Sequence, residues 1–328
     1  MAKYHLYGLG AALVDTEIEV QDSDLNTLGV EKGLMTLVDE SRQQALIDHL
    51  SDHLITSRRA SGGSAANTVI AASYFGANAC YACKVADDDN GEFYLQDLAD
   101  AGVTHHRNGS LPSGTTGKCL VLITPDAERS MNTYLGISES ISADNLNADA
   151  IANSEYLYIE GYLVTSESGR PAAVTARQIA EKAGVKTAIS LSDPGMVQFF
   201  KEGLQEMIGE RVHLLFANKD EALGWTGSDN IEDACEQLKQ SADCFAVTLG
   251  ADGALVYDGS ELHKVEGTTV EAVDTNGAGD MFAGAFLYGL SQGWEYSRAG
   301  AFACRAAGQV VSQYGPRLRA EQHKALLQ

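Results

Sequence analysis

Residues 274–280 read Asp-Thr-Asn-Gly-Ala-Gly-Asp, and the apolar run MFAGAFLYGL follows at once. This pattern predicts a helix that begins near residue 279, with two glycines at its start and an acid, Asp280, in its first turn. The peptide N–H groups at a helix start are unpaired and carry partial positive charge. Because glycines place no side chain in the way, these N–H groups can close on a bound anion.

Asp280 is the residue in this heptad that does not suit an anion site, because a carboxylate repels a bound anion. An acid at this position makes chemical sense if it takes a proton from a nucleophile that attacks the anion. The heptad therefore indicates a transfer reaction at a helix start.

The composition limits the partners of the chain. Of its 328 residues 45% are apolar, and 23 basic against 45 acidic residues give a formal net charge of −22. A surface with this much negative charge repels nucleic acid and anionic membranes. We therefore expect neither as a partner. A phosphate ligand would need positive potential supplied locally, by backbone N–H groups, a metal ion and a few Arg or Lys side chains.

The N-terminus shows no signal-peptide pattern and no apolar run is long enough to span a membrane, so we expect a cytoplasmic protein. Six scattered cysteines are consistent with reduced thiols. Cys80 and Cys83 form a C-x-x-C, which allows a redox or zinc interpretation. The stretch ANACYACKVA at 77–86 is typical of a strand, however, and would place the two thiols on opposite faces as small core residues.

Short apolar runs alternate with helical stretches along the chain, which predicts a mostly parallel sheet with helices on both faces. Ligands in such folds bind beyond the C-terminal ends of the strands. The expected strands are 4–10, 156–163, 186–192, 212–218 and 244–250, and the expected helices are 63–76, 90–101, 168–183, 218–224, 231–240, 279–292 and 295–313.

Two inserted segments break this alternation. Residues 16–62 are long and polar, with helix-like stretches around 23–28 and 40–50. Residues 104–136 are typical of β-structure, and the PDAE turn at 125–128 indicates a hairpin. We expect the two segments to form a small sheet that acts as a lid over the site, because closed sites exclude water.

Other glycine-rich motifs are ambiguous when taken singly. No P-loop or protein-kinase motif occurs, and GLGAAL at 8–13 lacks the third glycine of a dinucleotide fingerprint. SGGSAANT at 61–68 can be a plain capped helix, and TLGADGALVYDG at 248–259 can be a bare hairpin or a phosphate-lining turn. NKDEA at 218–222 fits a capping box or a water-mediated magnesium site.

The order of these motifs resembles the ribokinase-like (PfkB) family of carbohydrate and nucleoside kinases. GLGAALVD, GGSAANT, NKDE, TLGADG and DTNGAGD follow one another over nearly the whole chain, from Gly8 to about Tyr314. The resemblance implies a single ribokinase-like domain over 1–328, a three-layer α/β/α sandwich with a lid. It also implies ATP and Mg²⁺ as cofactors and transfer of the γ-phosphoryl group to a hydroxyl, usually a CH₂OH.

The resemblance also implies residue roles. Asp280 corresponds to the general base, and the N–H groups of Gly277, Ala278 and Gly279 to the anion hole. Metal-site counterparts are Glu221, through water to Mg²⁺, and Asp274, near a monovalent cation such as K⁺. The implied acceptor contacts are Asp15 at the end of the first strand, Gly62, Gly63, Asn67, Arg129 and Tyr162; the implied ATP contacts are Asn218, Thr248, Gly250, Gly253 and Thr275.

The insertion at 16–62 and the motifs MNTYLGIS and EGYL are similar to the adenosine-kinase-like branch of the family. An adenine acceptor would favour aromatic stacking partners, and Tyr7, Tyr134 and Tyr162 are candidates. The chain departs from the family at Cys304-Arg305, where relatives often carry Asn or His near the adenine.

Three functional hypotheses follow. The first is a kinase for a small-molecule sugar or nucleoside, a monomer or a homodimer through the lid edge. The second is a sugar- or nucleotide-binding regulator that has lost activity on the same fold, which the presence of Asp280 and Glu221 disfavours. The third, an NAD-dependent oxidoreductase, is disfavoured by Leu13 at the third fingerprint position.

Overall fold

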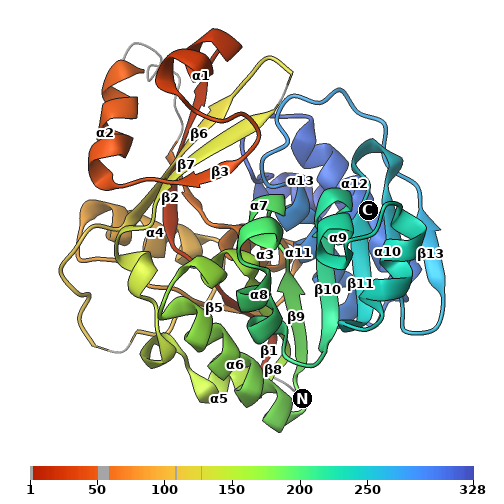
Figure 1. The fold of residues 1–328 in the computed structure, drawn as a ribbon. Helices are drawn as coiled ribbons and strands as arrows, with labels where there is room; N and C mark the ends of the chain where they lie inside the picture. Colours follow the sequence, from red (N-terminus) through yellow and green to blue (C-terminus); the bar gives the residue numbers. More distant parts are fainter. Residues whose placement is uncertain (1–2, 51–58, 108, 127) are drawn as a thin grey trace.

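The computed structural model describes residues 3–50, 59–107, 109–126 and 128–328. Two sheets organise them: a large sheet in the body of the molecule, and a small one that projects from it beneath helices α1 and α2 (Figure 1). Residues 51–58 of the first predicted insertion lie outside the described residues. Within the described ranges, no helix is both long and apolar enough to cross a membrane.

The large sheet has eight strands in the order β13-β12-β11-β10-β9-β8-β1-β5. Neighbours from β5 to β11 pair in parallel, while β12 and β13 pair antiparallel at one edge. The mostly parallel sheet predicted from the alternating pattern is therefore confirmed. The strands are β1 (Tyr4–Leu9), β5 (Ala79–Ala82), β8 (Ser154–Glu160), β9 (Lys186–Ser190), β10 (Val212–Asn218), β11 (Ala242–Thr248), β12 (Ala254–Tyr257) and β13 (Leu262–Val265).

Helices cover both faces of this sheet and bury one apolar cluster on each side, which confirms the three-layer α/β/α sandwich. One face carries α3 (Ser64–Phe75), α4 (Asp89–Asp100), α11 (Ala278–Ser291), α12 (Tyr296–Val311) and α13 (Ala320–Leu326). The other carries α5 (Ala148–Ala152), α6 (Gly169–Ala183), α7 (Pro194–Phe199), α8 (Lys201–Ile208), α9 (Lys219–Thr226) and α10 (Ile231–Leu238).

The small sheet has five strands in the order β3-β7-β6-β2-β4. They are β2 (Leu13–Glu19), β3 (Met35–Leu37), β4 (Arg59–Gly62), β6 (Gly117–Ile123) and β7 (Arg129–Tyr134). The predicted hairpin is confirmed, because β6 and β7 pair antiparallel. The expected helices appear as α1 (Asp22–Leu28) and α2 (Glu40–His49).

Strand alternation separates the two faces of the small sheet. Along β6, Leu120 and Leu122 pack into a cluster with α1 and α2, whereas Cys119 and Val121 pack with Met131 on the opposite face. That opposite face borders the cavity described below. The small sheet is thus covered by helices on one side and offers an apolar surface on the other.

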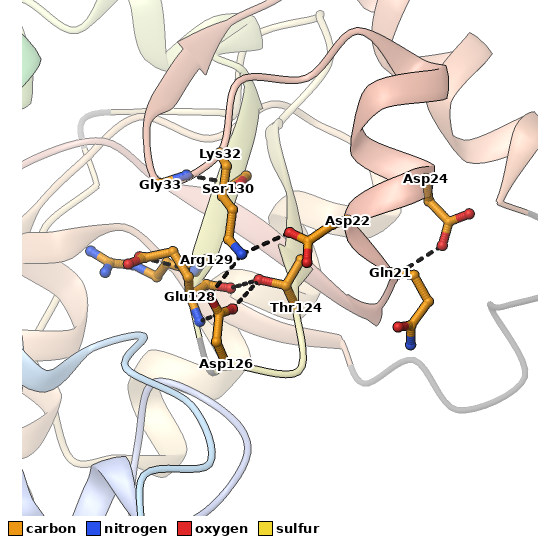
Figure 2. A network of polar contacts seen from close by, with 10 residues as sticks. All are labelled: Gln21, Asp22, Asp24, Lys32, Gly33, Thr124, Asp126, Glu128, Arg129 and Ser130. Atoms are coloured by element: carbon orange, nitrogen blue, oxygen red, sulfur yellow. Dashed lines mark hydrogen bonds and ion pairs between the residues drawn. The ribbon is translucent and has the colours of Figure 1, made fainter.

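An ion-pair network joins separate segments of the small sheet (Figure 2). The Lys32 ammonium donates to Asp22 at the start of α1 and to Asp126 at the hairpin tip, both at 2.7 Å. The Gly33 N–H donates to Ser130 Oγ at 3.0 Å. Arg129 follows the tip at the first position of β7, and in Figure 2 its side chain extends away from this network.

Two expectations from the sequence are corrected. Asp15 was expected at the end of the first strand, but β1 ends at Leu9 and Asp15 lies in β2 of the small sheet. The run YLYIEGYL was expected to be a strand throughout, but β8 ends at Glu160 and a short 3₁₀ helix follows.

The cysteines of the C-x-x-C are both buried and lie in separate apolar clusters on opposite faces of the large sheet, as predicted. Cys80 packs in the cluster with α6, and Cys83 in the cluster with α3. Burial raises the pKa of both thiols.

Candidate active site

A cavity of about 570 Å³ lies where the two sheets meet. Its walls come from the small sheet, from the first turns of α3 and α11, from the ends of β10 and β11, and from α12. Fifteen of the seventeen residues predicted for the site line this cavity, and Gly62 and Asp274 do not. Motifs more than 250 residues apart in the sequence therefore share one space, as the resemblance implied.

Helix α11 begins at this cavity as the heptad predicted. Gly277 caps it with a φ of 73°, and a side chain there would also collide with the Pro316 carbonyl. The Ala278 N–H donates to the Thr275 carbonyl at 3.2 Å. Among the described residues, nothing accepts a hydrogen bond from the N–H groups of Gly277, Gly279 or Asp280. These groups are the free donors at the helix start.

Two side chains from helix α3 hold the Asp280 carboxylate. Ser64 Oγ donates to Oδ1 at 2.6 Å, and Asn67 Nδ2 donates to Oδ2 at 3.1 Å. Burial raises the pKa of Asp280 above its usual value, and the bonds from Ser64 and Asn67 and the charge of Arg129 partly offset that rise. A carboxylate with a raised pKa is a better proton acceptor than an ordinary surface aspartate.

Asp15 provides a second carboxylate, on the small-sheet side of the cavity. Its side chain is 6% exposed, and no described residue donates a hydrogen bond to it. Burial and the nearby Glu17 raise its pKa well above the usual value. Gly62 of β4 pairs with Leu13 of the same strand as Asp15, and a side chain at Gly62 would collide with the Asp15 carboxylate. Gly62 therefore makes room for Asp15 without lining the cavity itself.

Gly63 and Asn67 complete this wall of the cavity. Gly63 has a φ of 96°, and a side chain there would collide with the Ala11 carbonyl. Asn67 is 4% exposed, and its Oδ1 atom accepts no hydrogen bond from the described residues. A buried amide oxygen without a donor is costly, so Asn67 is ready to accept one from a ligand.

Arg129 is the one basic side chain among the described residues that line the cavity. Its Nε atom is buried and has no hydrogen-bond partner in the described chain. Its charge lowers the pKa values of Asp280 and Glu221, which come from different elements of the cavity. Arg129 therefore supplies positive charge to the cavity of an otherwise acidic protein.

The face of the small sheet that borders the cavity carries apolar side chains beside Asp15, Arg129 and Thr133. Tyr162 faces it from the 3₁₀ helix Gly161–Thr165, with its hydroxyl donating to the Ser192 carbonyl at 3.2 Å. The other stacking candidates do not line the cavity: Tyr7 is buried in the core, and Tyr134 lies outside the wall. The apolar members of this wall are Leu13, Met35, Leu37, Met131 and Leu135.

The predicted nucleotide turn also lines the cavity. Thr248 ends β11, and Gly250 and Gly253 follow with φ values of 61° and 93°. A side chain at Gly253 would collide with the Val265 carbonyl, so the tight turn requires glycine there. Cys304 of α12 also lines the cavity, whereas Arg305 is exposed.

Asn218 and Glu221 form the capping box expected of α9. The Glu221 carboxylate accepts hydrogen bonds from the Asn218 backbone N–H at 2.9 Å and from its side-chain amide at 2.7 Å. Burial raises the pKa of Glu221 to about 7. Each carboxylate oxygen keeps a lone pair, so a metal-bound water can donate to it, which fits Mg²⁺ held through water.

Asp274 is fully buried beside the cavity and does not line it. Its carboxylate accepts hydrogen bonds from the N–H groups of Asn276 and Gly315, both at 2.8 Å. These bonds attach the loop before α11 to the segment after α12. A monovalent cation near Asp274 stays a prediction.

Two residues of the site escaped the sequence analysis. Ser64 lies in the stretch SGGSAANT, which was interpreted as a plain capped helix or a possible binding segment without a role for this serine, although it lies one turn from Asn67 and binds the same carboxylate. Glu160 lay inside an apolar run, and the structure shows it 1% exposed at the cavity wall with both oxygens bonded to distant backbone N–H groups. A lone acid at the end of a buried strand was the available signal.

The fold and the site together define a phosphotransferase that acts on an alcohol group, built as a ribokinase-like α/β sandwich. The chain belongs to the pfkB family of carbohydrate kinases, whose family model matches residues 37–323.

Solved structures and curated relatives agree with this assignment. The adenosine kinase of Sinorhizobium meliloti is 34% identical, with a TM-score of 0.93 and coverage of 99% of this chain and 98% of that one. A "probable sugar kinase protein" of Rhizobium etli is 32% identical, with a TM-score of 0.93 and coverage of 99% of both chains. The adenosine kinase of Schizophyllum commune is 27% identical over 97% of this chain and 98% of its own length.

Proposed function

We propose that the protein transfers the γ-phosphoryl group of ATP to the primary hydroxyl of a purine nucleoside. The observation that carries this proposal is the placement of Asp280. Asp280 has a raised pKa and lies at the same helix start as the free backbone N–H groups. The cavity around them is also lined by Asp15 and by the predicted nucleotide turn. A base and an anion site in one cavity are what attack on a phosphoryl group requires.

In the proposed reaction, the acceptor hydroxyl oxygen attacks the γ-phosphorus while its proton passes to Asp280. The new oxygen–phosphorus bond forms as the bond to the bridging oxygen breaks, and ADP leaves with that electron pair. The N–H groups of Gly277 and Gly279, together with Arg129, stabilise the charge on the transferring group. Ser64 and Asn67 orient the Asp280 carboxylate throughout.

We assign Mg²⁺ binding to Glu221, acting through water. When bound, the ion neutralises charge on the nucleotide phosphates. The residues fit this role because Glu221 is anchored by Asn218 and lines the cavity.

The nature of the cavity wall favours a nucleoside over a free sugar. A sugar presents hydroxyl groups on all sides, whereas the small sheet offers Leu13, Met35 and Met131 together with the ring of Tyr162. Such a wall suits the flat face of a base, and Asp15 and the free Oδ1 of Asn67 suit ribose hydroxyls. The full-length similarity to adenosine kinases supports the same choice.

The test is ADP formation from Mg-ATP with a panel of acceptors: adenosine, guanosine, inosine, ribose and fructose. We expect the highest kcat/KM with a purine nucleoside. Asp280→Asn should lower kcat by several orders of magnitude while ATP binding, measured by calorimetry, stays within about threefold. Asp220→Asn is the control, because Asp220 is an exposed acid in the first turn of another helix.

Near-normal turnover by Asp280→Asn would show that Asp280 is not the base. Turnover of ribose or fructose but of no nucleoside would overturn the acceptor assignment. Ligand-induced stabilisation without turnover of any acceptor would favour the inactive regulator.

A further inference from the structure

Two of the chain connections between the large and small sheets lie next to each other and are called crossings here. Gly10–Ala12 connects β1 to β2, which carries Asp15, and Gly63 connects β4 to α3, which carries Ser64 and Asn67. The two crossings touch each other, because a side chain at Gly63 would collide with the Ala11 carbonyl. Whatever fixes these crossings contributes to the position of Asp15, Ser64 and Asn67 relative to Asp280.

Glu160, at the end of β8, bonds to the first crossing and to the first turn of α3, which directly follows the second crossing. Its Oε1 atom accepts from the Ala11 N–H at 2.7 Å, and its Oε2 atom accepts from the Ala65 N–H at 2.8 Å. These partners lie 149 and 95 residues away in the sequence. A side chain at Gly10 would collide with Oε2, so the backbone approaches the carboxylate as closely as a glycine allows.

Two buried tyrosines add hydrogen bonds to the same crossings. The Tyr81 hydroxyl donates to the Ala11 carbonyl at 2.9 Å, and the Tyr94 hydroxyl donates to the Gly62 carbonyl at 2.9 Å. Side chains thus hold several peptide groups at the crossings, beside the backbone bond from the Gly10 N–H to the Ala82 carbonyl. Glu160 is the one acid of this group, and its two bonds are charge-assisted.

We propose that Glu160 is a positioning residue that clasps the first crossing and the start of α3, and that it sets the distance between the acceptor wall and Asp280 in the phosphoryl transfer. This inference rests on the proposed function. It differs from an acceptor-binding role, because both carboxylate oxygens are already engaged by the protein backbone. Replacing Glu160 should therefore change the binding and alignment of the acceptor, and it should leave the nucleotide turn unaffected.

The two hydrogen bonds that form the clasp depend on the protonation state of Glu160. Burial raises its pKa to about 7, and the neutral acid cannot accept two N–H bonds equally, because one oxygen then carries a proton. The clasp should therefore loosen as the pH falls through about 7. The titratable groups that interact with Glu160 from the surrounding elements are Tyr81, Cys83, Tyr94, Tyr158 and Asp280.

The test compares Glu160→Gln with Glu155→Gln. Glutamine keeps the size of the side chain, but its NH₂ group would face one of the two N–H donors. Glu155 is a partly exposed acid at the other end of the same strand, outside the cavity wall. We expect Glu160→Gln to raise the acceptor KM at least tenfold and to leave the ATP KM within twofold. Glu155→Gln should change neither.

Hydrogen exchange provides a readout that does not depend on activity. In Glu160→Gln the N–H groups of Ala11 and Ala65 should lose protection, while those in β10 and β11 should not. Normal protection at both positions, or equal changes in the two KM values, would overturn the proposal. Failure of the proposed function would be distinct, because the wild type would then turn over no acceptor.

Two further measurements cover the case in which Glu160→Gln does not fold. Glu160→Asp keeps the charge but is too short to bridge both N–H groups, so the same KM difference is expected. In the wild type, the protection factors of Ala11 and Ala65 should be lower at pH 6 than at pH 8. Equal protection factors at the two pH values would contradict the clasp.

Discussion

Ser64 Oγ donates a hydrogen bond of 2.6 Å to the Asp280 carboxylate, across 216 residues of sequence. The bond joins the helix that follows the small sheet to the helix that begins at the anion site. It favours the ionised form of Asp280, against the burial that disfavours it. The pKa of Asp280, the proposed base, is therefore set in part by a side chain of α3.

Ser64→Ala should move the acidic limb of the kcat/KM profile to higher pH. The proposed mechanism requires ionised Asp280, so activity should be lost as the pH falls through its pKa, and a further rise in that pKa should shift the loss to higher pH. We expect a shift of about one pH unit, since hydrogen bonds to charged groups contribute roughly 1.5–3 kcal/mol and one unit is about 1.4 kcal/mol. Ser73→Ala, in the last turn of the same helix, is the control. Superimposable profiles for Ser64→Ala and wild type would contradict this coupling.

Arg129→Met should lower kcat by about 10²-fold, because it removes the one basic side chain among the described cavity residues. Acceptor binding, measured by calorimetry without nucleotide, should be little changed. Lys118→Met is the matched control, because Lys118 is a cation on the neighbouring strand β6 that does not line the cavity. If both variants lost activity equally, a general charge effect would replace the specific role of Arg129.

Tyr162→Ala should raise the KM for adenosine roughly tenfold or more, since it removes an aromatic ring from the apolar wall. Tyr162→Phe keeps the ring and loses only the bond to the Ser192 carbonyl, so its KM should stay within about threefold of wild type. Steady-state kinetics with adenosine and ribose distinguish the two effects. A similar KM for adenosine in wild type and Tyr162→Ala would rule out stacking.

Glu221→Gln should make the stability of the protein less dependent on pH. The pKa of Glu221 is raised to about 7 by burial, so this group adds stability below the unfolded pKa near 4.5, and that stability is lost as the pH rises through about 7. Between pH 5 and pH 8, the free energy of unfolding of the variant should therefore increase relative to that of wild type. The upper limit of the gain is about 3 kcal/mol, from a shift of roughly 2.5 units.

Urea unfolding at several pH values measures this gain. Asp220→Asn should follow the wild-type curve, because Asp220 is the exposed neighbour of Glu221. A constant difference between Glu221→Gln and wild type across this range would mean that Glu221 titrates normally. A stability cost borne at neutral pH is consistent with retention of the acid for function.

The sequence predicted the parts of the molecule that depend on local chemistry. The DTNGAGD heptad has glycines and an acid at a helix start, and it folds as a helix start capped by Gly277. The capping box of Asn218 and Glu221 and the hairpin around residues 125–128 follow from equally short patterns. Such features are specified within a few residues and need no tertiary context.

Features that depend on tertiary packing were harder to predict. Asp15 was placed at the end of the first strand because GLGAALVD is one apolar run, yet the chain leaves the large sheet within it and enters the small sheet. The short helices α5, α7, α8 and α13 also escaped, since helices of this length depend on packing more than on propensity. Glu160 could not be assigned because its partners lie 95 and 149 residues away.

The division of the cavity between the two sheets has a consequence for protein engineering. The acceptor wall is encoded by segments before residue 163, whereas the helix start and the nucleotide turn are encoded after residue 247. A chimera that exchanges the first portion with that of a sugar-specific relative should inherit the donor's substrate preference and retain the host's chemistry. New specificities can then arise by recombination, as long as the exchanged portion keeps Ser64, Asn67 and Arg129, which contact or face the proposed bond-breaking centre.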